Sequence, residues 1–282
     1  MYPRTRIRIR CAEAGARAAV YGWPGPHVPR LGLIWWCRRP YTGPVIARAY
    51  LVVNADDLGY SSGVNRGIFD AHDRGIVTSA SLMVRRPASA SAAVGARSRP
   101  QLGLGLHVDL GDWVADAGEF RRHGAFVDHV DPAAVAAEVD GQIERFNEIV
   151  GHDPTHLDSH HHLHREEPLR SVLDERAWNL GIPLRHTSEA HYCGEFYGQD
   201  ANGVTLPGAL RPERLAALLR ALPDGANELR CHPGYAYNLA SSYGMERELE
   251  LRALCDARLP AVLAEERIAL VSFAELRERL AA

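Results

Sequence analysis

Short apolar stretches alternate with segments of helical pattern from Tyr50 to the C-terminus of the chain. The apolar stretches have the length and the Val, Ile and Leu content of buried strands. We expect strands at residues 51–55, 77–84, 102–108, 155–159, 183–186, 228–231 and 269–272.

Helix signals fill the gaps between these strands. Asp131 followed by Pro132 is an N-cap with proline at the first helical position, and Gly151 ends the helical pattern. We expect helices over residues 62–75, 131–151, 168–181, 246–258 and 273–280, and one more that begins at residue 212. This alternation is typical of βα units around a parallel sheet.

Two α/β architectures fit such a pattern. About seven strands in residues 50–282 predict a (β/α) barrel, one strand short of the usual eight, and an open doubly wound sheet is the alternative. The first strand is followed by D-D-L-G-Y-S-S-G, which is neither G-x-G-x-x-G nor a P-loop. The nucleotide-binding form of the open sheet is therefore disfavoured.

Residues 1–49 differ from the rest of the chain, with nine arginines against one acidic residue, Glu13, and three of the five tryptophans. We expect an N-terminal extension that is disordered or results from a misplaced start, with Val45 as the true initiator. A secretory signal is the alternative, because residues 31–37 are apolar and residues 47–49 read A-x-A. Arginines that follow the apolar run argue against it.

Composition narrows the class of protein. The 282 residues are 46% hydrophobic, which suits one sizeable domain with its own core. The formal charge of −3 does not create the positive electrostatic potential that attracts nucleic acid. No apolar run reaches the ~18–20 residues that span a bilayer, so we expect no membrane partner. The five cysteines show no C-x-x-C spacing, which argues against a disulfide framework and favours a reducing cytoplasm.

The first sign of chemistry is T-H-L-D-S-H-H-H-L-H at Thr155–His164, which holds five of the fourteen histidines. Neutral imidazole is the commonest metal ligand in proteins. If this segment is a strand, His156, Asp158 and His160 share one face. A solvated His-rich loop is the alternative, but the regular placing of Leu and Asp favours a metal site.

Polar residues also end three other expected strands. The first strand runs into Asp56 and Asp57, which point to opposite sides unless the strand ends there. His107 lies at the end of L-G-L-G-L-H-V, and Pro233 holds His232 in an extended conformation. Turn formation by the aspartates, a hydrogen-bonded core His107 and a simple turn at His232 are the structural alternatives.

One parallel sheet would bring all these strand ends to one rim, where ligands bind in α/β proteins. Two histidines and one carboxylate leave open positions on a divalent ion, which can activate water and polarise a carbonyl. A second carboxylate can take the proton of that water, and a further histidine can protonate a leaving group. These are the parts of a metal-assisted amide or ester hydrolase.

Five segments of the chain carry a family resemblance. They are N-A-D-D-L-G (54–59), G-I-V-T-S-A-S-L-M-V (75–84), G-L-H-V-D-L (105–110), T-H-L-D-S-H-H-H-L-H (155–164) and C-H-P-G (231–234). In this order they resemble the YdjC-like carbohydrate deacetylases, which include chitooligosaccharide and hopanoid-associated deacetylases. The resemblance covers residues 50–282 and implies a deformed (β/α) barrel, similar to the polysaccharide deacetylases.

The resemblance also implies an activity and a site. The activity is removal of acetyl groups from N-acetylated sugars, with Mg²⁺ or Zn²⁺ as the ion and a homodimer as a possible assembly. Matched by position, the metal ligands are Asp57, His107 and His160. Asp56 then resembles the general base and His232 the general acid.

The chain departs from the family pattern at Leu58, where relatives often have Phe, and in residues 112–130, which are shorter than in many relatives. The change at Leu58 should alter packing slightly. The shorter segment should alter the substrate cleft but not the metal site. Four histidines have no assigned role, and we expect them to orient ligands or to pack: His156, His161, His162 and His164.

Two other classes of protein use the same residue set. A non-haem iron oxygenase needs two histidines and one carboxylate, but it needs no neighbouring aspartate base, and the βα alternation argues against it. A non-catalytic sugar-binding relative could keep the fold. Since all five key positions are filled, the sequence favours the enzyme.

Overall fold

The computed structural model describes residues 47–280 except 117, 118, 124, 125, 201, 238 and 240. The expectation for residues 1–49 therefore lies outside the described residues, apart from 47–49. Within the described part, no helix is both long enough and apolar enough to cross a membrane.

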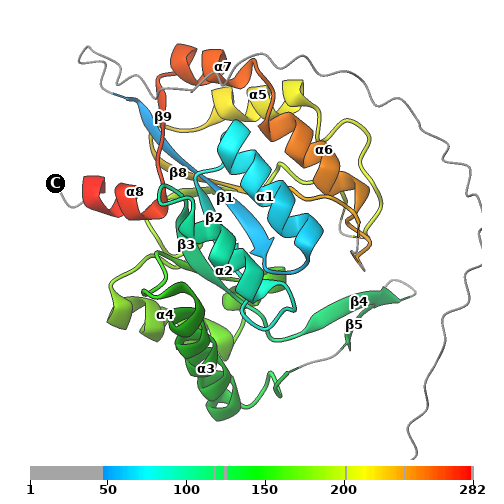
Figure 1. The fold of residues 1–282 in the computed structure, drawn as a ribbon, viewed down its shortest axis with the longest axis vertical. Coiled ribbons are helices and arrows are strands. Elements are labelled where there is room, and N and C mark those ends of the chain that lie inside the picture. The colour runs from blue at the N-terminus through cyan, green and yellow to red at the C-terminus, as the bar shows by residue number, and fades with distance from the viewer. Residues whose placement is uncertain are drawn as a thin grey trace, which may run out of the picture. The chain divides into compact units, whose positions relative to one another are not determined.

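The centre of the fold is a seven-stranded sheet in which every pairing is parallel (Figure 1). Its order is β6-β3-β2-β1-β8-β7, and β9 pairs with the first residues of β1. The bounds are β1 Ala49–Leu58, β2 Ser79–Leu82, β3 Gly103–Val108, β6 Leu157–Ser159, β7 His191–Cys193, β8 Gly225–Cys231 and β9 Ile268–Leu270. The expected α/β class with about seven parallel strands is confirmed.

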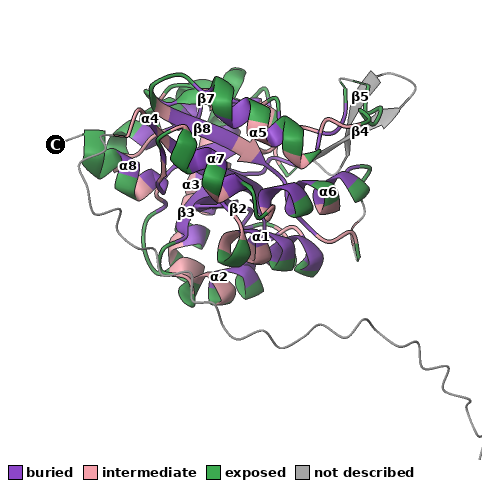
Figure 2. Ribbon diagram, turned by 90° about the horizontal axis from the view of Figure 1, so that it is seen from above, coloured by how far each residue is buried: buried purple, intermediate pink, exposed green. Residues whose placement is uncertain are grey.

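Helices cover this sheet, and Figure 2 shows buried strands enclosed by helices with exposed outer faces. Their bounds are α1 Ser62–Arg74, α2 Ser89–Arg97, α3 Pro132–Val150, α4 Leu169–Leu180, α5 Pro212–Ala221, α6 Met245–Leu254, α7 Leu259–Glu265 and α8 Phe273–Leu280, with a 3₁₀ segment η1 at His160–Arg165. The Asp131 carboxylate accepts hydrogen bonds from the first backbone N–H groups of α3, and Gly151 ends this helix at φ 97°. The predicted start and stop of α3 are confirmed.

Several expected elements differ from the structure. Residues 183–186 form only one bridge, between Leu184 and Leu157 of β6, and the edge strand β7 lies at the opposite side of the sheet, next to β8. The expected helix over 246–258 ends at Leu254 as α6, because the chain turns at 255–258, and a further helix, α7, begins at Leu259. An antiparallel hairpin, β4 Asp112–Asp116 with β5 Glu119–His123, was not expected.

Strand β1 lies at the middle of the core. Nine of its ten residues are buried, and it pairs with β2, β8 and β9. Leu51 and Val53 belong to the main hydrophobic cluster, and Val52 belongs to a second one. The strand is therefore buried on both of its faces. The end of β1 is therefore a rigid place for polar side chains.

His156 belongs to the packing of the sheet. Its ring stacks on Phe273 at a centroid separation of 4.0 Å and lies against Gly105, where an added Cβ would come within 2.4 Å of the imidazole. Burial lowers the pKa of His156 to about 4, so the ring is neutral. This histidine fills space, as one of the four unassigned histidines was expected to do.

The close approach of Gly105 and His156 predicts a clear stability effect. Gly105→Ala should lower the free energy of unfolding by about 1–3 kcal/mol, because the new methyl group overpacks a buried ring. The matched control is Gly141→Ala in α3, where an added Cβ meets nothing within 4 Å. This substitution should raise the free energy of unfolding by roughly 0.5–1 kcal/mol, because alanine favours a helix more than glycine does. Urea denaturation of both variants measures these changes, and equal stability of the two would contradict the packing argument.

Candidate metal centre and active site

An irregularity in β1 lets two adjacent aspartates serve one site. The register between β1 and β2 shifts between Ala55 and Leu58, and Asp57 has φ 69°, a left-handed conformation that aspartate tolerates better than most residues. Both carboxylates therefore reach His107: Asp57 directly, and Asp56 as a member of a buried group with His107 and Asp158. Adjacent residues of a regular strand would point to opposite sides, but this irregular backbone lets both aspartates face the same site.

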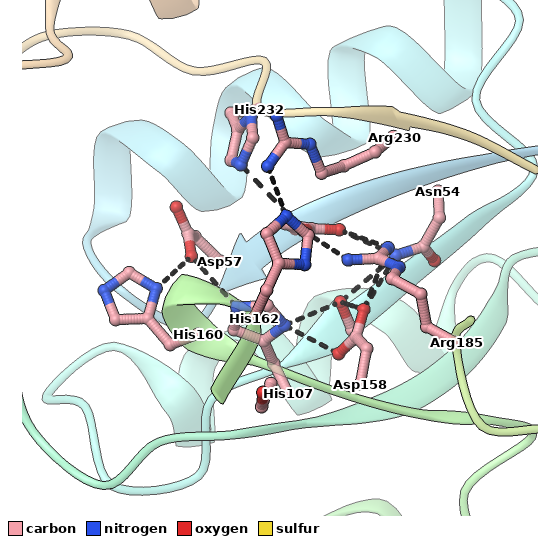
Figure 3. Close-up of polar contacts among 12 residues, drawn as sticks. Asn54, Asp57, His107, Asp158, His160, His162, Arg185, Arg230 and His232 are labelled. Atoms are coloured by element: carbon pink, nitrogen blue, oxygen red, sulfur yellow. Dashed lines mark hydrogen bonds and ion pairs between the residues drawn. The ribbon is translucent and has the colours of Figure 1, made fainter. Parts of the chain in front are cut away.

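The side chains of Asp57, His107 and His160 meet at one point, and each comes from a different strand end. The Oδ1 atom of Asp57 lies 3.3 Å from His107 Nε2 and 3.2 Å from His160 Nδ1 (Figure 3). The Oδ1 atom is buried and accepts no hydrogen bond from any described residue. Ligand atoms about 2.1 Å from one ion are about 3.0–3.4 Å apart, so these residues fit a divalent ion.

His160 reaches this point from just beyond its strand. β6 ends at Ser159, and His160 begins the 3₁₀ segment η1, in which His161 and His162 adopt left-handed φ values of 55° and 56°. The expected alternation therefore stops after Asp158. The ring of His161 lies beside that of His160, with centroids 3.9 Å apart.

Asp158 orients His107. Its Oδ1 atom lies 2.6 Å from His107 Nδ1, and the two residues are register partners on β6 and β3. This contact turns His107 Nε2 toward Asp57, as carboxylate–histidine pairs do at metal sites. Burial opposes a charge on His107, but the carboxylates of Asp158, Asp57 and Asp56 together outweigh it and raise the pKa of His107 to about 10. Metal binding at Nε2 would replace that proton.

A buried arginine holds the other carboxylates. Arg185 donates two hydrogen bonds to Asp56, of 2.7 and 2.8 Å, and also lies 3.0 Å from Asp158 Oδ2 and 2.7 Å from Glu228 Oε1. Asn54 Nδ2 adds a 2.9 Å hydrogen bond to Asp56. Burial raises the pKa of Asp56, but Arg185, together with His107 and His232, outweighs burial and lowers this pKa far below its usual value. Asp56 is therefore ionised.

A second buried arginine holds Asp57. Arg247 from α6 donates a 2.5 Å hydrogen bond to Asp57 Oδ2. Burial raises the pKa of Asp57, and Arg247 is the largest of the groups that lower it well below its usual value. Because Oδ2 is bound to arginine, Oδ1 is the oxygen that remains for an ion.

His232 lies on the far side of Asp56. Its Nε2 atom is 3.8 Å from Asp56 Oδ2, and its Nδ1 atom is 3.7 Å from Glu250 Oε1. Glu250 also accepts hydrogen bonds from the His232 backbone N–H and from the Tyr243 hydroxyl. The rings of Tyr197 and Tyr243 pack edge-on against His232. These contacts fix the ring at the position where Figure 3 shows it, opposite Asp158.

The structure thus brings together all five residues that the sequence singled out. The sequence reasoning missed Arg185, Arg247 and Asn54. A charged residue inside an expected strand was the available signal for Arg185, and a polar residue in an apolar run was the signal for Asn54. Arg247 gave no signal, because it stands in a helix with several other charged residues.

Comparison with known proteins identifies a family model and related deacetylases that this chain resembles. The family model described as "YdjC-like protein" matches residues 50–265. A carbohydrate deacetylase of Geobacillus stearothermophilus is 36% identical over 248 residues, which cover 80% of this chain and 97% of that protein. A chitooligosaccharide deacetylase of Salmonella schwarzengrund (strain CVM19633) is 32% identical over 249 residues, which cover 76% of this chain and 94% of that protein.

Solved structures show the same fold. A protein of Enterococcus faecalis V583, for which cellobiose-phosphate cleavage has been suggested, superimposes with a TM-score of 0.69 at 28% identity, covering 82% of this chain and 99% of that one. The Xyl-CE4 domain of a multidomain xylanase from the hindgut metagenome of Trinervitermes trinervoides gives 0.51 at 13% identity, covering 83% and 91%, a likeness of fold alone. From the match of the family model and the two curated relatives, the chain belongs to the YdjC-like family.

Proposed function

We propose that this protein is a metal-dependent carbohydrate deacetylase that hydrolyses the acetamide of N-acetylated sugars. Two curated relatives with more than 30% identity are named as deacetylases of carbohydrates. The observation that carries the proposal is the meeting of Asp57, His107 and His160 around one buried oxygen, with Asp56 and His232 beside them.

Asp57, His107 and His160 would hold the ion, which we propose to be Mg²⁺ or Zn²⁺. When bound, such an ion lowers the pKa of a water molecule and polarises the acetyl carbonyl. The one carboxylate and two imidazoles leave positions open for these oxygens.

Asp56 is the proposed general base and His232 the proposed general acid. Ionised Asp56, fixed by Arg185, accepts a proton from the attacking water as the new C–O bond forms. The protonated ring of His232 donates to the amide nitrogen as the C–N bond breaks. The products are acetate and a free amino sugar.

We also propose a cytoplasmic enzyme. In the described part of the chain, Cys193, Cys231 and Cys255 are free thiols, which a reducing compartment preserves.

The function is tested by acetate release. Purified protein with its metal should release acetate from N-acetylated oligosaccharides, a chelator should stop the reaction, and Mg²⁺ or Zn²⁺ should restore it, because the ion polarises the carbonyl. An enzyme-coupled acetate assay over a panel of chain lengths measures this. Acetate release that continues unchanged in the chelator would refute the metal dependence, and no release across the panel would favour a sugar-binding protein.

The role of Asp56 is tested by Asp56→Asn. This variant keeps the shape of the side chain and the three metal ligands but loses the base, so kcat should fall by about 10²–10⁴-fold while bound metal stays unchanged. Elemental analysis and acetate release measure the two quantities. Asp140→Asn in the partly exposed Arg176 pair is the control and should act like the wild type. Near wild-type turnover of Asp56→Asn would show that another group is the base.

The role of Asp158 is tested by Asp158→Asn. Losing the carboxylate on His107 Nδ1 should weaken divalent metal binding by about 10–100-fold, since this contact orients the ring and makes it more basic. Isothermal titration of the metal-free protein measures the affinity, and Asp140→Asn again serves as the control. Unchanged affinity would mean that His107 needs no such support.

A further inference from the structure

A second group of histidines lies next to the catalytic rim. His162 and His164 come from η1, and His186 follows the Leu184 bridge on another segment. One ring nitrogen of each histidine lies within 4.8 Å of a ring nitrogen of the other two. Two distant parts of the chain therefore direct three imidazoles to one place.

Two ring nitrogens in this group of histidines lack partners although they are buried. His162 Nδ1 and His164 Nε2 make no hydrogen bond to any described residue. A buried polar atom without a partner costs about 1–3 kcal/mol, so native proteins rarely contain one unless an ion or a water molecule occupies the adjoining space.

The arrangement of the rings fits one shared ion. Imidazoles bound to a tetrahedral ion at about 2.0–2.1 Å have ring centroids about 5 Å apart. The observed separations are 5.5 Å for His162–His164, 5.5 Å for His162–His186 and 5.2 Å for His164–His186. All three pairs are close to this value, so the three rings themselves need little movement to bind.

Neighbouring groups orient two of the rings. Ser159 Oγ lies 2.8 Å from His164 Nδ1 and can accept a hydrogen bond from the N–H at this atom. The lone pair of His164 Nε2 is then free to bind an ion. His162 Nε2 accepts a hydrogen bond from Arg230 Nη1, and the Tyr192 hydroxyl lies 3.3 Å away from the same atom. With an ion on His162 Nδ1, Nε2 would carry a proton and donate it to the Tyr192 oxygen as Arg230 moves aside.

The protonation state of the rings favours the same conclusion. Burial lowers the pKa of His164 to about 3 and that of His186 to about 4, so both rings are in the neutral form that binds metals. The carboxylates of Asp56, Asp158 and Glu228 surround Arg185 and offset its charge, whereas Arg230 lies directly on His162. An ion at this place would therefore compete with Arg230 for His162.

We propose that His162, His164 and His186 form a second metal site, distinct from the one at Asp57. Three imidazoles with no carboxylate suit Zn²⁺, Co²⁺, Ni²⁺ or Cu²⁺ better than Mg²⁺, which prefers oxygen ligands. A bound ion would tie η1, which supplies His160, to the segment that supplies Arg185. The second site would thus fix the spacing between a ligand of the first ion and the arginine that holds the base.

The experiment counts bound ions in the full chain. Metal-free wild type is titrated with Co²⁺, followed by isothermal titration and by the visible absorption of the ion. We expect two equivalents for the wild type and one for His186→Gly, a substitution that suits the φ of 67° at this position and so should leave folding intact. His191→Ala, at an exposed histidine of β7, is the matched control and should keep two equivalents.

Asp57→Asn separates the two sites. We expect it to lose the first equivalent and keep the second, and Zn²⁺ should raise the melting temperature of this variant but not that of the double variant with His186→Gly. A single equivalent in wild type that His186→Gly abolishes would still support the second site while counting against the first. The proposal is overturned if His186→Gly binds as many ions as the wild type.

Discussion

The rim of the sheet buries three carboxylates around one guanidinium, that of Arg185. Removing a charged group from water costs several kcal/mol even after the surroundings relax, unless partners replace the lost hydration. Arg185 supplies those partners for Asp56, Asp158 and Glu228 together, and all four side chains are almost completely buried. Without this arginine, the rim at the end of the sheet would hold uncompensated negative charge, and Asp56 could not remain ionised.

The same constraint explains how each carboxylate divides its two oxygens. Asp57 gives one oxygen to Arg247 and presents the other to the two histidines. Asp158 gives one oxygen to His107 and the other to Arg185. Asp57 and Asp158 therefore each have one oxygen neutralised by a buried arginine and one available for imidazole or metal, whereas Arg185 binds both oxygens of Asp56. Specific geometry follows from this division, because neither Asp57 nor Asp158 can rotate without losing a charged partner.

The sequence was sufficient to predict that the aspartates after β1 and the histidines of other strand ends come to one rim, because the carboxyl ends of parallel strands share one edge of a sheet. The choice of Asp57, His107 and His160 as the ligand set came from the family resemblance. The sequence did not predict the bulge at Asp57, since a positive φ leaves no trace in hydrophobic periodicity. Arg185 and Arg247 were missed for another reason: their partners are 129 and 190 positions away in the chain. Strand β7 was missed because its residues are partly exposed at the edge, so no apolar run marks them.

One consequence concerns how the site can move. Three strands pair with β1, so its amide protons should exchange with solvent only when the whole domain opens. Asp56 and Asp57 lie at the irregular end of this strand and are held by Arg185 and Arg247, so this half of the rim should move least. Any adjustment that admits a bulky sugar or releases a product must come from the other half of the rim, where η1 and the segment after Leu184 leave the sheet.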